Sequence, residues 1–200
     1  MKNLTKEGLK NLYTKEKKSV SDIAKIFNCS ERGIDYWIKK YDIQKRTISE
    51  AVYIKWNPTG DPFKIKKIIG KKDIGLKNLG LGIYWGEGDK SPNNTSVRLS
   101  NTDPFLLKKF REFLRVIYNV KEEKIQYGLI LFNDINERDA VNFWEKHLGV
   151  KRSKLGKITI IPPQGNGTYK RKSKYGVLII IFTNKKLKEQ ILNDIKNLYI

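Results

Sequence analysis

The chain has 200 residues, of which 39% are hydrophobic, so it can form one large packed domain or two small ones. Lysine and arginine together number 41 against 21 acidic residues, and the formal net charge of +20 calls for a polyanionic partner, for which nucleic acid is the first expectation. One cysteine and one histidine exclude an internal disulfide and a zinc cluster of Cys and His ligands.

No stretch of the chain approaches the roughly 18 consecutive apolar residues of a membrane-spanning helix. The longest apolar run, Val177 to Phe182, has the length of a strand. The opening MKNLTKEGLK also lacks the apolar stretch of a secretion signal. We therefore expect a cytoplasmic protein that does not enter a membrane.

Residues 1–46 are predicted to form a unit of three short helices. Ser19 and Ser30 can cap the second and third helices, since a serine oxygen accepts a hydrogen bond from the free amides of a first helical turn. Asp22 lies where a negative charge is favourable to the helix dipole. The apolar residues recur at helical spacing, namely Leu9, Leu12, Tyr13, Val20, Ile23, Ala24, Phe27, Ile34, Trp37 and Ile38.

The spacing between the second and third helices is the more specific signal. Ala24 provides the small residue that closely crossing helices need, and Asn28 suits a turn because it tolerates a left-handed backbone. Ile34 and Trp37 follow at the interval that packs the third helix. The segment 5–41 resembles the helix-turn-helix family of DNA-binding units.

This resemblance implies that the third helix enters the major groove of double-stranded DNA. Arg32, Tyr36 and Lys39 are its candidate DNA-contacting residues, and Arg46 after the helix is a candidate for a phosphate or the minor groove. The alternative is a small helical bundle with a solvated charged face.

Residues 47–75 lose clear periodicity and are predicted to be a basic linker. They contain NPTGDP and a lysine-rich stretch after it, and turn-forming residues of this kind favour irregular structure. A short helix around Ser49 to Lys55 can extend the first domain.

The segment 76–90, LKNLGLGIYWGEGDK, is predicted to be an apolar helix with glycines four residues apart. Glycine costs about 1 kcal/mol relative to alanine inside a helix, so Gly82 and Gly86 on one face indicate a close contact with another helix. Glu87 follows at the end of that face, and Asp89 adds a second carboxylate.

This pattern resembles the motif of the LAGLIDADG homing-endonuclease family. Gly82, Gly86, Glu87 and Gly88 match its small, small, acidic and glycine positions, whereas Tyr84 and Trp85 are bulkier than its usual residues and glutamate replaces its more frequent aspartate. The resemblance implies an α+β fold in which residues 76–200 form a core with an antiparallel sheet. The expected strands and helices after the motif follow the family's order: strands at 96–100, 124–132, 157–161 and 175–182, and helices from 103, over 137–148 and from 185.

In that family the outward side chains of the sheet meet DNA, which makes Arg98 a candidate contact. The segment 162–174, PPQGNGTYKRKSK, is rich in glycine and basic residues, so Lys170 and Arg171 are candidate phosphate contacts. The alternative is a solvated hairpin loop.

The family likeness also implies a mechanism. A single motif implies a homodimer in which Gly82 and Gly86 form the helix interface and the two Glu87 carboxylates hold Mg²⁺ for phosphodiester hydrolysis. Lys157 is the candidate for offsetting the developing charge. Three alternatives stay open: a transcriptional regulator with this core and no nuclease activity, a structural role for Glu87 at the helix crossing, and a basic RNA-binding protein.

Overall fold

The computed structural model describes residues 4–67, 70–162 and 173–198, and the fold is mixed α+β. The chain divides into two compact units, Met1–Asp61 and Pro62–Ile200. We describe each unit by itself. None of the helices in these ranges is long and apolar enough to cross a membrane.

The first unit begins with three helices, and the second and third are capped at the predicted residues Ser19 and Ser30. α1 (Lys6–Lys10) continues as a π-helical turn over Asn11–Lys15, and α2 (Val20–Phe27) and α3 (Glu31–Lys40) follow. The Ser19 hydroxyl accepts from the amide of Asp22, whose carboxylate accepts from the Ser19 amide in return. Asn28 ends α2 in the left-handed region at φ 50°. The three helices enclose a small core of Leu9, Tyr13, Ile23, Ala24, Ile34, Ile38 and Ile43.

The segment expected to be a linker contains the short helix that the sequence predicts around Ser49 to Lys55. A capping box between Thr47 and Glu50 starts α4 (Ile48–Trp56), which contains no buried residue. The residues after Asp61 belong to the second unit, where the amides of Lys64 and Lys66 donate to the last carbonyls of a later helix at 2.8 Å each. Backbone hydrogen bonds thus attach this stretch to the larger unit, and the structure divides the chain after Asp61 and not after residue 75.

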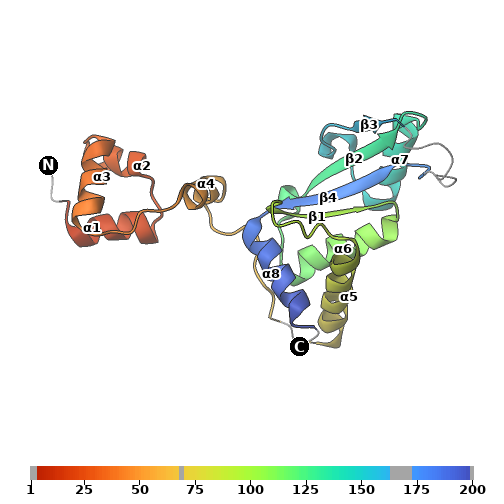
Figure 1. Ribbon diagram of the computed structural model, residues 1–200, viewed down its shortest axis with the longest axis horizontal. Helices are drawn as coiled ribbons and strands as arrows, with labels where there is room; N and C mark the ends of the chain where they lie inside the picture. Colours follow the sequence, from red (N-terminus) through yellow and green to blue (C-terminus); the bar gives the residue numbers. More distant parts are fainter. Residues whose placement is uncertain (1–3, 68–69, 163–172, 199–200) are drawn as a thin grey trace. The chain divides into compact units, whose positions relative to one another are not determined.

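The second unit alternates helices with the strands of one sheet (Figure 1). In chain order its elements are α5 (Lys71–Glu87), β1 (Ser96–Asn101), α6 (Pro104–Ile117), β2 (Gln126–Phe132), α7 (Glu137–Leu148), β3 (Thr159–Ile161), β4 (Val177–Thr183) and α8 (Lys185–Lys196), with short 3-10 turns at Glu122–Lys124 and Arg152–Lys154. Each strand that the sequence predicts is present, and α5 begins five residues before the predicted start.

The sheet has the order β1-β4-β2-β3 and is mixed rather than antiparallel. β4 pairs antiparallel with both β1 and β2, whereas β3 pairs parallel with β2. A parallel pair needs a crossover connection, and α7 supplies it between β2 and β3. The expectation of an antiparallel sheet is therefore wrong for β3.

The helices α5, α6 and α8 lie on one face of this sheet (Figure 1). Alternate strand residues point toward that face, as the two-residue period of a strand requires. Val97 and Leu99 of β1 are thus fully buried, while Arg98 between them is partly exposed on the opposite face. The core of this unit also includes Tyr84 of α5 and Phe113 of α6.

Candidate DNA-binding and metal sites

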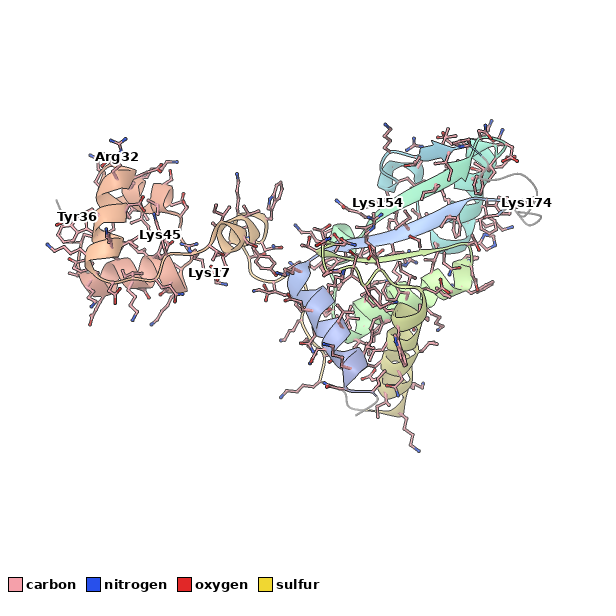
Figure 2. All side chains as sticks on the ribbon, in the orientation of Figure 1. Lys17, Arg32, Tyr36, Lys45, Lys154 and Lys174 are labelled. Carbon is pink, nitrogen blue, oxygen red and sulfur yellow. The ribbon has the colours of Figure 1, made fainter. Side chains whose placement is uncertain are left out.

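The outer face of α3 carries the three side chains that the sequence assigns to DNA contact. Ile34 and Ile38 are buried and hold one side of α3 against the core, which leaves Arg32, Tyr36 and Lys39 exposed on the other. The side chain of Tyr36 is 58% exposed. Figure 2 shows Arg32 and Tyr36 projecting outward from α3. The face therefore offers a guanidinium, a phenol and an ammonium to a ligand.

Arg46, in contrast, is used inside the first unit. Its guanidinium donates to the carbonyls of Tyr13 at 3.2 Å, Lys17 at 3.1 Å and Lys18, and lies 4.0 Å over the ring of Tyr13. These carbonyls lie around the end of the first helix, where backbone acceptors lack helical partners. The sequence predicted Arg46 as a DNA contact, but both terminal nitrogens of its guanidinium donate to carbonyls of the first unit itself.

The neighbouring Lys45 is also tied to the first unit. Its ammonium lies 2.8 Å from a carboxylate oxygen of Asp35 on α3. The hydrogen bond that Lys45 donates to Asp35 raises the pKa of Lys45 above its ordinary value. The segment after α3 is thus fastened to that helix.

On α5, Gly80 is the glycine that allows close contact with another helix of the same chain, α6. A Cβ placed there would lie 2.1 Å from Cγ of Phe113 on α6. Gly82 and Gly86 have no atom within 4 Å of such a Cβ. Residues two positions apart on a helix point to different sides, so Gly82 points away from the contact that Gly80 makes. Gly82 and Gly86 therefore face outward, and their surface is open to a second chain.

The face around Gly82 and Gly86 combines small residues with exposed apolar ones. Ile74 is 49% exposed, Leu79 48% and Trp85 53%. After Asp73, α5 contains two charged residues, Lys77 and Glu87, and Lys77 is paired with Asp194 of α8 at 3.2 Å. An exposed apolar helix face in so basic a chain is typical of an association surface.

Glu87 is the last residue of α5 and is exposed. Its carboxylate makes no hydrogen bond or ion pair with the described part of the chain. The carboxylate of Asp89, in contrast, accepts from the amide of Ser91 at 2.9 Å and from the side chain of Asn94 at 2.6 Å. These hydrogen bonds hold the pKa of Asp89 below its usual value. Glu87 is therefore the carboxylate available to a ligand, while Asp89 shapes the loop.

The described residues contain no group of three or more His, Cys, Asp or Glu side chains that could hold a metal ion. Divalent magnesium prefers oxygen ligands and usually takes one or two carboxylates together with waters and phosphate oxygens. Glu87 fits such a site only as one member. A metal at this point would need further oxygens from a second chain or from DNA.

Lys157 lies at the opposite edge of the sheet from Glu87. The backbone register joins Gly88, Leu99, Ile180, Tyr127 and Leu155 in one row across the sheet. With neighbouring strands about 4.8 Å apart, the four steps of this row span roughly 19 Å. Within one chain, Lys157 therefore lies far from the Glu87 carboxylate that is predicted to bind the metal.

The remaining predicted contacts divide between the sheet and an undescribed loop. Arg98 lies on the face of the sheet opposite the helices, in register with Ile181 of β4 and Gln126 of β2. By the alternation of the strands, this face also carries the polar residues Ser96, Ser100, Gln126 and Thr183 and the apolar residues Ile179 and Ile181. Lys170 and Arg171 lie outside the residues that the structure describes.

Sequence reasoning missed two residues that shape the end of α5. The ring of Tyr84 is fully buried and stacks on Phe110 at 5.7 Å between centroids, and a Cβ on Gly88 would lie 2.4 Å from its Cδ2. Lys188 of α8 is only 4% exposed and binds the loop after α5. The unusual bulk of Tyr84 inside a glycine-rich helix was a signal, whereas nothing local marked Lys188.

Comparison of the chain with protein-family models, with curated proteins and with solved structures finds no match. The arguments for function consequently rest on the residues and their geometry.

Proposed function

We propose that the protein binds double-stranded DNA through α3, used as the recognition helix of a helix-turn-helix. The observation that supports this most directly is the face of Arg32, Tyr36 and Lys39, which is exposed while the opposite face of α3 is buried. Arginine can bind guanine bidentately in the major groove, and a lysine can pair with a phosphate. The net charge of +20 adds sequence-independent attraction to the DNA backbone.

Selection of a preferred duplex from a random pool, followed by titration at fixed salt, tests this proposal. Arg32→Ala and Tyr36→Ala should each weaken binding to the selected duplex about tenfold or more, because a base contact contributes roughly 1–3 kcal/mol. Lys10→Ala is the matched control, since Lys10 is exposed on α1 away from this face. Equal affinities for all four proteins would contradict the assignment of α3.

The catalytic part of the proposal is a homing endonuclease of the LAGLIDADG type. Two chains would meet through the Gly82 and Gly86 faces of α5, so that both Glu87 carboxylates bind Mg²⁺ beside a DNA phosphate. Such ions activate water and stabilise the leaving oxygen in phosphodiester hydrolysis. Supporting this, Glu87 is exposed and unpaired within the described residues, and the glycine face is open.

Incubation of the selected duplex with Mg²⁺ tests for cleavage. The wild-type protein should nick or cut the duplex, and Glu87→Gln should bind it with unchanged affinity and not cut. Glu123→Gln is the matched control, because it removes the same charge from an exposed residue of a short 3-10 turn. Cleavage by Glu87→Gln at the wild-type rate would remove Glu87 from the mechanism.

The second candidate function is a transcriptional regulator that keeps the fold and lacks the nuclease. Two observations favour it: each chain contributes one uncommitted carboxylate at the end of α5, and Lys157 lies across the sheet from it. Specific, metal-independent binding without cleavage would decide for the regulator. Tighter binding to RNA than to any duplex DNA would instead favour the RNA-binding alternative.

A further inference from the structure

The chain leaves α5 through a short stretch that is tied to two neighbouring elements. Gly88 forms a β-bridge with Leu99 of β1, and the amide of Asp89 donates to the carbonyl of Arg98 at 3.0 Å. From the core, the hydroxyl of Tyr84 donates to the carbonyl of Asp89 at 2.8 Å. The backbone on the C-terminal side of Glu87 is thus held from both sides.

The rest of this loop is fixed by Lys188, one turn into α8. Its ammonium donates to the carbonyl of Ser91 and to that of Asn94, at 2.7 Å each. It also contributes to the low pKa of the Asp89 carboxylate, which itself binds both of these residues. The ammonium therefore stands where a cation would be expected, among two carbonyls and a carboxylate.

The burial of Lys188 shows that this arrangement is specific. A buried ammonium is unfavourable unless hydrogen bonds and opposite charge replace its hydration. Lys188 is 4% exposed, whereas the side chain of Lys185 on the same helix is 66% exposed and pairs with Glu189. An exposed lysine such as Lys185 would be enough to keep the protein soluble.

We propose that Lys188 is a positioning residue for Glu87: by binding the carbonyls of Ser91 and Asn94 it holds residues 88–95 in place. The role in cleavage rests on the proposed nuclease function. Loops without such ties open at low free-energy cost, and a displacement of about 1 Å can slow a reaction by about a hundredfold. Lys188 thereby connects α8 to the one uncommitted carboxylate at the end of α5.

The test compares the full-length wild type with Lys188→Met and the control Lys185→Met by two measurements. Without DNA, hydrogen exchange at the amides of Asp89 and Ser91 should be at least about tenfold faster in Lys188→Met, with unchanged protection in β2 and β4. On selected duplex with Mg²⁺, the single-turnover cleavage rate should fall about tenfold or more at unchanged DNA affinity. Lys185→Met should match the wild type in both.

Each outcome distinguishes this proposal from the nuclease proposal. Unchanged exchange in residues 88–95 overturns the role of Lys188 whether or not the protein cuts DNA. Faster exchange with an unchanged cleavage rate overturns the positioning of Glu87 and leaves the nuclease intact. A wild-type protein that never cuts overturns the nuclease and the catalytic role of Lys188, while the exchange result still decides whether Lys188 holds the loop.

If Lys188→Met does not fold, Lys188→Gln replaces it, because its shorter neutral side chain removes the ammonium that donates to both carbonyls and keeps a polar group at this position. The same two measurements then apply, with the same outcomes supporting or overturning the proposal.

Discussion

Gly80 of α5 lies directly against Phe113 of α6, whose side chain is fully buried. A Cβ on Gly80 would meet three atoms of Phe113 at 2.1 to 2.6 Å. No real Cβ is found so close to another heavy atom, and the surrounding core leaves the ring no free space to move into. The close crossing of α5 and α6 therefore requires a residue without a side chain at position 80.

We predict that Gly80→Ala destabilises the larger unit by about 1–3 kcal/mol or more, through overpacking of the core. Gly82→Ala should instead stabilise the monomer by about 0.5–1 kcal/mol, because its Cβ has open space and alanine favours the helix. Urea unfolding of both variants, followed by circular dichroism, measures the difference. A stable Gly80→Ala protein would mean that α5 and α6 can separate at little cost.

These two glycines show what the sequence could and could not predict. Helical spacing and the caps at Ser19 and Ser30 located α2 and α3, and strand-sized apolar runs located β2 and β4, because those signals are local. Which of several glycines meets a neighbouring helix depends on the partner's side chains, and no local pattern contains that information. That Gly80, and not Gly82, meets a helix of the same chain consequently became visible only in the structure.

The remaining differences also arise from long-range contacts. The direction of β3 depends on the path of α7, whereas a strand of three residues has the same pattern in either direction. Arg46 resembled a DNA contact because basic residues follow the third helix, but its acceptors lie 28 to 33 residues earlier in the chain. Lys188 donates to the carbonyl of Ser91, which lies 97 residues earlier in the sequence.

The internal role of Arg46 leads to a prediction about stability. Arg46→Met should destabilise the first unit by about 1.5–3 kcal/mol, because charged hydrogen bonds to carbonyls are lost. Hydrogen exchange should therefore accelerate throughout α2 and α3 with no change in β4. At a temperature where the variant is folded, its affinity for the selected duplex should fall less than that of Arg32→Ala. A larger loss would restore Arg46 as a DNA contact.

The open face of α5 leads to a prediction about self-association. Gly82→Leu should shift the protein from dimer to monomer in sedimentation experiments, because a large side chain prevents the close approach that the glycine allows. Lys108→Leu on α6 adds a leucine to an exposed position away from this face and should leave the dimer intact. A wild type that is monomeric at every concentration, with and without DNA, would contradict the two-chain site.

Tyr84 leads to a prediction about alkaline pH. Burial raises the pKa of its phenol from 10.0 to about 12, with the Asp89 carboxylate adding to the rise and a backbone hydrogen bond from Arg98 opposing it. The folded state thus favours the neutral phenol more than the unfolded state does. The resulting stability is fully present below pH 10 and is lost as the pH rises from 10 to 12.

Tyr84→Phe separates this contribution from the other groups that titrate in the same range. Below pH 10 the variant should be less stable by about 1 kcal/mol, because the hydrogen bond to the Asp89 carbonyl is lost. Between pH 10 and 12 its free energy of unfolding should fall less steeply than that of the wild type, so that the two curves converge. Parallel curves for Tyr84→Phe would show that the phenol ionises without opposing the fold, and that water reaches its hydroxyl group.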